Sequence, residues 1–198
     1  MGCDTVVFNP YDDTVFLYTT SENTRTGELV FLGRLVTQKG CDTLIEALGI
    51  IKNELGAAPS ATIIGDGPER GNLLNLARKL GVSDCVKFVG TKSGKELSKE
   101  LNRHKVLVVP SRYEEPFGTV ALEGMACGLI PIVSQNGGLI DAIGTHGFVF
   151  ENGMAVELAE KICLSLYNSE IRSQTLHGVA EHLSSYTARA VAKKYLQE

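Results

Sequence analysis

The chain has no long apolar run. No stretch approaches the roughly 18 apolar residues that a membrane-spanning helix requires, so we expect no integral membrane segment. Positive charge is not in excess either, since 19 Lys and Arg against 23 Asp and Glu give a formal net charge of −4. This balance argues against broad attraction to nucleic acid or to a membrane surface, while leaving room for a local basic pocket.

Paired cysteine and histidine motifs are also missing. The cysteines are odd in number, widely spaced and without a CxxC pair: Cys3, Cys41, Cys85, Cys127 and Cys163. We therefore expect reduced, mostly buried thiols rather than disulfides or a zinc site. The 4 histidines show no HExxH spacing, and each is interpreted as a surface or packing residue. Reduced thiols are typical of a cytoplasmic protein, which we expect here, and Met1-Gly2-Cys3-Asp4 begins no secretory signal.

Strand and helix patterns alternate along most of the chain. The 198 residues, 43% of them hydrophobic, suffice for one full-sized domain or two small ones. Residues 1–28 form an irregular lead-in with a possible short strand at 6–8. Strands are then predicted at Leu29–Gly33, Ala61–Ile64, Val86–Val89, Val106–Val109, Ile130–Val133 and Gly147–Phe150.

Apolar residues at helical spacing fill the connections between these strands, and Ser93 with Glu96 matches a capping box at the start of one helix. Three helical segments, within 155–166, 171–183 and 188–196, close the chain. Short loops between alternating strands and helices predict an α/β fold. Residues 29–198 should form one Rossmann-like doubly wound parallel sheet with right-handed crossovers.

The stretch from Val106 to Ser134 is the centre of the chain's chemistry. It is interpreted as a strand, a loop with two adjacent carboxylates, a helix opened by Gly118, and a second strand. Open α/β sheets bind anionic ligands where strand ends feed helix N-termini, because free backbone N–H groups point outward there. We therefore place the candidate site in this loop, around Glu115.

A second candidate lies in the loop Gly33–Gly40, which lacks GxGxxG and GxxxxGK[ST]. Arg34 and Lys39 are five residues apart at a predicted strand end, and could clamp a diphosphate from two sides. The alternative, that both are solvated loop charges, stays open. The turn Gly65–Pro68 could likewise let a ligand approach the backbone, but turn geometry alone explains it and is the favoured interpretation.

The third candidate is the pair Glu115 and Glu123. An ionised carboxylate is an acceptor and suits vicinal hydroxyls. Glu123 lies in an otherwise apolar helix, so we expect a ligand or a cation to pair with it. A two-carboxylate glycosidase is the rival interpretation, although a phosphate clamp at Arg34 and Lys39 makes little sense for a simple glycosidase.

The order and location of these motifs resemble the donor-binding, C-terminal half of retaining glycosyltransferases of the GT-B fold, specifically glycosyltransferase family 4. The resemblance covers about residues 28–168 and rests on FLGRLVTQKGCDTLIEAL, ATIIGDGPE, VKFVG, VLVVPSRYEEPFGTVALEGMACGLIPIV, GG and GFVFENG. NPYDDTVF resembles that family's link from its acceptor domain. The closing helices resemble the segment that crosses back toward that domain.

This resemblance implies roles for individual residues. Arg34 and Lys39 would hold the diphosphate and stabilise the leaving nucleotide, with Gly33 beside them. Glu115 would contact the hydroxyls of the transferred sugar, and Glu123 the ribose hydroxyls. Backbone N–H groups would reach sugar and phosphate from Phe117, Gly118 and Thr119. The loop 90–93, with Thr91, lies where the family seats the base.

The resemblance also implies front-face attack with retention, assisted by the departing phosphate, with no metal or other cofactor required. No DxD motif is present; Asp12 and Asp13 lie in the lead-in. The donor would be a nucleotide sugar, with a UDP-sugar and hexosyl transfer as the first expectation. The acceptor-binding N-terminal domain would be absent from this chain, so donor binding without transfer is expected.

Two departures from the family pattern leave the base and sugar open. His104-Lys105 stands where the family often has Ala-Asp, and the segment between Pro131 and Gly137 is one residue shorter than usual. Two further alternatives remain. One is another enzyme of the same architecture, such as a sugar-nucleotide epimerase or a glycogen-type phosphorylase. The other is a non-catalytic module that only binds a partner.

Overall fold

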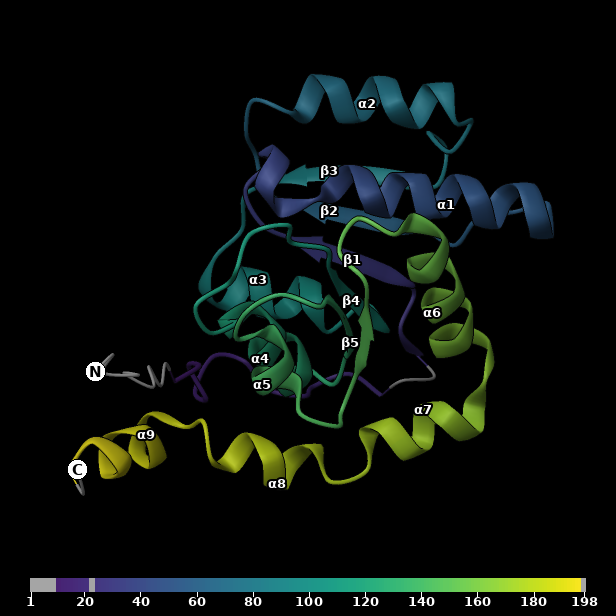
Figure 1. Cartoon of the computed structure of the whole chain (residues 1–198). Coiled ribbons are helices and arrows are strands. Elements are labelled where there is room, and N and C mark those ends of the chain that lie inside the picture. The colour runs from purple at the N-terminus through teal and green to yellow at the C-terminus, as the bar shows by residue number, and fades with distance from the viewer. Residues whose placement is uncertain (1–9, 22–23, 197–198) are drawn as a thin grey trace.

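The computed structural model describes residues 10–21 and 24–196. These residues form a six-stranded sheet with the order β3-β2-β1-β4-β5-β6, and every pair of neighbouring strands is parallel (Figure 1). The strands are β1 Leu29–Leu32, β2 Ala61–Ile64, β3 Val86–Gly90, β4 Val106–Val109, β5 Ile130–Ser134 and β6 Phe148–Phe150. The predicted Rossmann-like α/β fold is thus confirmed. The possible strand at 6–8 lies outside the described residues.

Two hydrophobic cores, one on each face of the sheet, explain the apolar strand sequences. In β4 all of Val106–Val109 is buried, as expected for a central parallel strand covered on both sides. One core joins the sheet to α1 Cys41–Leu55, α2 Arg70–Lys79 and α6 Ala155–Tyr167. The other joins it to α3 Gly94–Leu101, α4 Thr119–Ala126 and α5 Leu139–Ile143.

The strand order reverses between β1 and β4, which is the switch point of the sheet. Loops leave neighbouring strands there in opposite directions, and open α/β sheets bind ligands in the resulting crevice. The two loops concerned are the one after β1, with the short 3-10 helix η2 Thr37–Lys39, and the one after β4. Both were singled out in the sequence, and the fold brings them together.

The closing segment differs from its prediction. Instead of one helix over 171–183, the chain forms α7 Ser169–Leu176 and α8 Val179–Ser184, separated by Gly178 at φ 80°. Together with α9 Ala188–Tyr195 they run along the edge of the domain (Figure 1). The short α5 helix was not predicted, because five residues are too few for a helical period to stand out.

The capping box predicted at Ser93 is half right. Ser93 occupies the N-cap position of α3, but its side chain makes no capping hydrogen bond. Glu96 instead receives a 2.6 Å hydrogen bond from Lys92. The ion pair replaces the reciprocal bond that the capping box requires.

The described part of the lead-in packs on the domain. Tyr11 and Phe16 are buried in the core that contains α4. Arg25 is buried as well; its guanidinium donates to the carbonyl oxygens of His104 and Cys127, the latter at 2.6 Å. Residues 10–21 and 24–28 are therefore anchored to the domain, and the division of the chain at residue 28 stays a prediction.

Cysteine and histidine side chains take packing roles in the described residues. Cys41 and Cys127 are buried, Cys85 and Cys163 are half-buried, and all four are free thiols. His104 is buried, with hydrogen bonds to the Glu100 carbonyl and the Thr62 hydroxyl. Across residues 10–21 and 24–196, no group of three His, Cys, Asp or Glu side chains could hold a metal ion. None of the described helices is long and apolar enough to cross a membrane.

Candidate functional site

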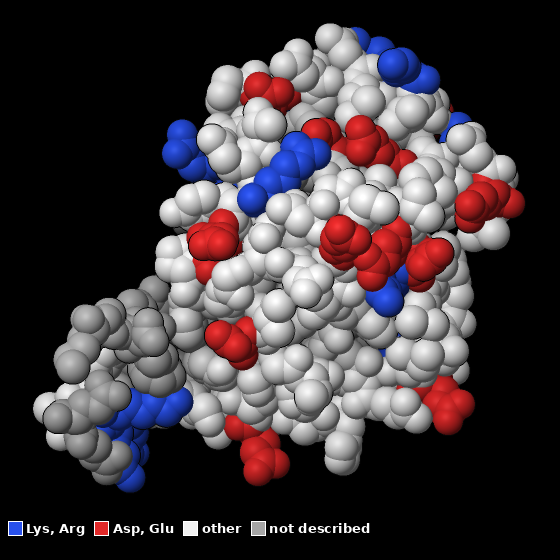
Figure 2. All heavy atoms as spheres, viewed as in Figure 1, with Lys and Arg blue, Asp and Glu red and all other residues white. Residues whose placement is uncertain are grey.

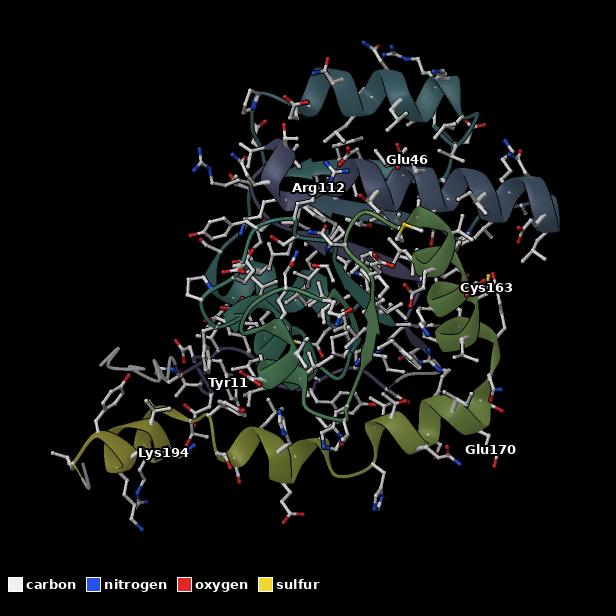
Figure 3. All side chains as sticks on the ribbon, viewed as in Figure 1. Tyr11, Glu46, Arg112, Cys163, Glu170 and Lys194 are labelled. Carbon is white, nitrogen blue, oxygen red and sulfur yellow. The ribbon has the colours of Figure 1, made fainter. Side chains whose placement is uncertain are left out.

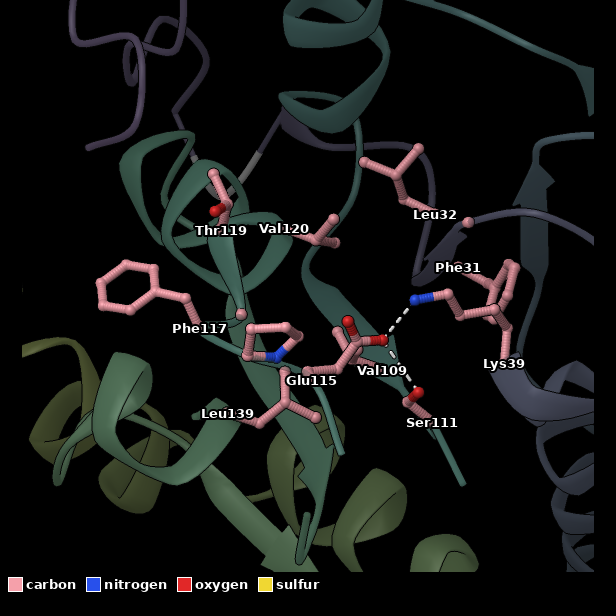
Figure 4. A pocket seen from close by; sticks show the side chains of 13 residues that line it. Phe31, Leu32, Lys39, Val109, Ser111, Glu115, Phe117, Thr119, Val120 and Leu139 are labelled. Atoms are coloured by element: carbon pink, nitrogen blue, oxygen red, sulfur yellow. Dashed lines mark hydrogen bonds and ion pairs between the residues drawn. The ribbon is translucent and has the colours of Figure 1, made fainter. Parts of the chain in front are cut away.

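A pocket of about 220 Å³ opens at the carboxyl ends of β1 and β4 (Figure 4). It lies at the switch point, where the loop after β1 faces the loop after β4. Its walls are partly apolar and partly polar, and consist of Phe31, Leu32, Gly33, Lys39, Val109, Ser111, Glu115, Pro116, Phe117, Gly118, Thr119, Val120 and Leu139. The strand ends thus form a small pocket with a charged pair on one side.

The charged pair is Lys39 and Glu115. The Lys39 ammonium forms an ion pair and hydrogen bond with Oε1 of Glu115. Ser111, fully buried, donates from its hydroxyl to the same oxygen at 2.8 Å. Two donors therefore hold one oxygen of the carboxylate, and no hydrogen bond or ion pair with a described residue engages Oε2.

Arg112 ties the loop after β4 to the start of α1. Its backbone N–H donates to the Gln38 carbonyl at 2.7 Å. Its guanidinium bonds the Asp42 carboxylate at 2.8 Å and the Thr43 hydroxyl at 3.0 Å. Figure 3 shows Arg112 beside the N-terminal part of α1. These contacts fix how the two site loops face one another, and so set the geometry of the Lys39–Glu115 pair.

The loop after β5 supports the site from the other side. The Gly138 N–H donates to the Glu115 carbonyl at 2.7 Å. A Cβ atom at Gly138 would lie 2.7 Å from the Phe117 Cα and from the Pro116 carbonyl oxygen, so only glycine permits this approach. The side chain of Asn136 donates to the Ser111 carbonyl at 2.7 Å. Gly137-Gly138 therefore holds the backbone of the Glu115 loop.

Helix α4 starts at the pocket wall. Its N-cap Gly118 has φ 78°, a left-handed conformation that favours glycine, and no side chain caps this end. The first turn of a helix leaves backbone N–H groups without partners inside the helix. Thr119 and Val120 of this first turn line the pocket. Donors and the positive end of the helix dipole are thus available to an anion.

Glu123 lies one turn further along α4, on the same face as Thr119 and Val120. Burial and, to a smaller extent, the negative charge of Asp12 together raise the pKa of its carboxyl to about 7. No Lys, Arg or His among residues 10–21 and 24–196 forms an ion pair with it. The sequence predicted that either a cation or a ligand pairs with Glu123. The described residues provide no such cation.

The structure brings six of the predicted site residues to the pocket wall: Gly33, Lys39, Glu115, Phe117, Gly118 and Thr119. The other three lie off it. Arg34 and Thr91 are exposed in their loops, and Glu123 is further along α4. Arg34 does not line this pocket, and its clamp with Lys39 stays a prediction. In the structure Lys39 pairs with Glu115 from the loop after β4.

Sequence reasoning missed Ser111 and the glycines 137 and 138 as parts of the site. The Pro110-Ser111 step directly after a buried strand was a signal for a polar residue at the strand end. Gly65 and Gly67 have a role in the turn itself, which was the favoured interpretation. A Cβ atom at Gly65 would lie 1.9 Å from the Gly33 carbonyl oxygen, and one at Gly67 would lie 2.4 Å from the Leu35 carbonyl oxygen. Their turn packs directly against the loop after β1.

Surface charge agrees with a local rather than a broad basic site. On the described part of the face in Figure 2, Lys and Arg are interspersed with Asp and Glu and do not gather into a wide basic patch. A nucleic acid backbone is recognised by such a patch. The positive elements that the structure places near the pocket are Lys39 and the start of α4.

Comparison with known proteins identifies the family. Residues 19–177 match the family of glycosyl transferases group 1. The chain belongs to this family. An uncharacterised glycosyltransferase of Methanocaldococcus jannaschii is 43% identical over 115 residues, which are 58% of this chain and 29% of that protein. A second one from the same organism is matched over 39% of its length, so the chain spans well under half of these relatives.

Solved structures of glycosyltransferases share the fold. Anabaena HepE, in complex with UDP and glucose, has a TM-score of 0.83 at 21% identity, covering 96% of this chain and 55% of that one. The C-terminal domain of a group 1 family glycosyl transferase (LpcC) from Francisella tularensis has a TM-score of 0.77 at 21% identity. That match covers 89% of this chain and 98% of the domain.

Proposed function

We propose that this chain is the C-terminal, donor-binding domain of a retaining GT-B glycosyltransferase of family 4, which binds a nucleotide-diphosphate sugar. The observation that carries the proposal is the pocket at the β1/β4 switch point, where Lys39, Glu115 and the N-terminus of α4 meet. A cation and a helix N-terminus suit a diphosphate. A carboxylate with one free oxygen suits a sugar hydroxyl.

Each site residue then has a role. Lys39 and the start of α4 hold the diphosphate, and Arg34 reaches it from its exposed position in the loop after β1, so that both cations stabilise the leaving nucleotide. Glu115 accepts hydroxyls of the transferred sugar. Glu123, half-buried and without a cation partner in the described structure, accepts the ribose hydroxyls.

The remaining site residues complete the donor site. Gly33 lets the ligand approach the end of β1. Phe117, Gly118 and Thr119 present backbone N–H groups. Thr91, at the carboxyl end of β3, lies toward the base. Neither a metal nor another cofactor has a role in this proposal, because cations of the protein and the helix dipole meet the charge of the diphosphate.

UDP is the nucleotide we propose first. The HepE structure of the same fold contains UDP and glucose, which supports this donor. A hexosyl group would be transferred, with retention, to an acceptor bound by an N-terminal domain outside this chain. Partial coverage of the relatives supports that missing partner. We further propose a cytoplasmic location and, because the GT-B active site lies between two domains, no transfer by this chain alone.

The packing of the chain's described ends is consistent with a second domain. Tyr11 bridges to Thr187, and its N–H donates to the Tyr186 carbonyl at 3.3 Å. The lead-in and the α8–α9 connection, which the family resemblance assigns to the two interdomain links, therefore lie side by side (Figure 1). Both links would reach the acceptor domain from one side of this domain.

Calorimetric binding of UDP, GDP and ADP, each with and without an attached glucose, tests the proposal. Arg34→Ala/Lys39→Ala is compared with Arg78→Ala/Lys79→Ala, which removes the same charge from the exposed end of α2. We expect one nucleotide to bind selectively, and only the first double variant to lose it. Absence of binding to every nucleotide would overturn the proposal and favour the non-catalytic interaction module.

A further inference from the structure

The two carboxylate oxygens of Glu115 differ in their contacts. Oε1 receives both the Lys39 ammonium and the Ser111 hydroxyl. Oε2 has no hydrogen bond or ion pair with a described residue, and Figure 4 shows it turned away from Ser111. One oxygen is thus fixed by the protein, while the other is left to a ligand in the pocket.

The position of Ser111 makes this division firm. Its side chain is fully buried, and its carbonyl oxygen receives hydrogen bonds from Ser134 Oγ at 2.5 Å and from Asn136 Nδ2 at 2.7 Å. The backbone of Ser111 is therefore held by β5 and the loop after it. A donor on such a fixed residue orients the carboxylate rather than following it.

The ion pair also sets a charge balance for the pocket. Lys39 cannot give its full charge to a diphosphate while Glu115 shares it, and the carboxylate itself repels phosphate oxygens. In a sugar nucleotide the distal phosphate is a diester with one negative charge. In the free nucleoside diphosphate it is a monoester with up to two. Glu115 therefore opposes the free diphosphate more strongly than the sugar-bearing donor.

We propose that Ser111 is a positioning residue that presents Oε2 of Glu115 to the sugar, and that the Lys39–Glu115 pair makes the pocket prefer the sugar nucleotide over the free nucleoside diphosphate. The inference rests on the proposed function. A sugar hydroxyl donates to Oε2 and offsets the repulsion, whereas a nucleotide without its sugar meets the negative charge with nothing to offset it. The same pair thus favours donor capture and product release.

The test is the ratio of two dissociation constants, for UDP and for UDP-glucose, measured by calorimetry on the whole chain. In Glu115→Gln the negative charge is removed with little change of shape, so UDP affinity should rise about three- to tenfold, as expected for one charge interaction that solvent screens. UDP-glucose affinity should not rise. Glu114→Gln is the matched control, because Glu114 is the adjacent, exposed carboxylate, and it should leave both constants unchanged.

Ser111 is tested in the same way. Ser111→Ala should weaken the binding of UDP-glucose about three- to tenfold, which is the loss expected for one ordinary hydrogen bond, and leave the affinity for UDP within twofold. Ser111→Thr, which keeps the hydroxyl, should restore the ratio. If Ser111 has a purely structural role, Ser111→Ala should instead lower the affinities for UDP and UDP-glucose together. That result would overturn its assignment as a positioning residue.

The outcomes separate this inference from the proposed function. If the wild type binds UDP and UDP-glucose but Glu115→Gln leaves their ratio unchanged, the charge-balance inference is wrong while the donor site stands. If the wild type binds neither UDP, GDP, ADP nor their glucose conjugates, the donor-site proposal fails and this inference fails with it. The inference is supported if Glu115→Gln raises the affinity for UDP relative to that for UDP-glucose and Glu114→Gln does not.

Discussion

The rings of Phe117 and Tyr186 lie 5.7 Å apart and are inclined by 58°. Phe117 stands directly before the N-cap of α4, while Tyr186 comes from the connection between α8 and α9. Tilted ring contacts continue from Tyr186 to His182 and from His182 to His146, each with ring centroids 5.1 Å apart. A continuous row of rings thus connects the closing helices to the wall of the pocket.

Removing the Tyr186 ring should loosen this connection. We expect Tyr186→Ala to cost about 1–2 kcal/mol in the free energy of unfolding, from the lost aromatic pair and its burial, and to weaken UDP binding. Tyr186→Phe keeps the ring and removes only the hydroxyl, which donates to the Asp141 carbonyl at 3.1 Å. Denaturant unfolding and calorimetry measure both effects. Equal behaviour of the two variants would contradict a role of the ring.

Gly138 should be intolerant of a side chain. In Gly138→Ala the added methyl would lie 2.7 Å from backbone atoms of Pro116 and Phe117, so the loop must move. We expect a loss of about 1–3 kcal/mol in unfolding free energy and weaker UDP binding. Gly71→Ala is the control, since that position in α2 has nothing within 4 Å of the new atom. It should be neutral or stabilising, because alanine favours the helix. A Gly138→Ala protein as stable as wild type would refute the prediction.

Glu123 should make stability fall as the pH rises. Its folded pKa of about 7 lies above the ordinary value of 4.5, so the folded state holds the proton more tightly. The resulting stabilisation is complete below the unfolded pKa and is lost as the pH rises through about 7. We expect on the order of 2 kcal/mol across that window, after allowance for partial exposure of the carboxyl.

Denaturant unfolding at a series of pH values measures this effect. Glu123→Gln should flatten the dependence between pH 4.5 and 7 relative to wild type. Glu160→Gln, an exposed carboxylate of α6, should follow the wild-type curve. Parallel curves for wild type and Glu123→Gln would show that burial does not raise this pKa.

Arg25 should anchor the lead-in. Its guanidinium donates to two backbone carbonyls and lies over the Tyr18 ring at 5.2 Å. In Arg25→Met the His104 and Cys127 carbonyls lose this donor in a buried setting, and we expect a loss of about 2–3 kcal/mol in unfolding free energy. Arg189→Met, at an exposed position of α9, should change stability by less than about 0.5 kcal/mol. Equal stability of the two variants would contradict the anchoring role.

Elements with a strong local signal could be predicted from the sequence. β2 and β4 have the predicted bounds, because compact β-branched runs in Ala61–Ile64 and Val106–Val109 are typical of buried parallel strands. The closing helices were harder: the pattern over 171–183 was weak, and Gly178 divides it into two. Short elements such as α5 owe their helical form to packing on α4 and β5 rather than to their own periodicity.

The sequence by itself determined the order of strands and helices, the residue types of the site and, through their motifs, the family. Only the tertiary structure decided which of these residues meet. Lys39 and Glu115 are 76 residues apart, and their contact exists because β1 and β4 are neighbours at the switch point. The same contact depends on Ser111 and on Gly138, whose roles are bonds and close approaches to distant backbone. Such contacts leave no local pattern in a sequence, because each is set by the packing of elements that the chain brings together only on folding.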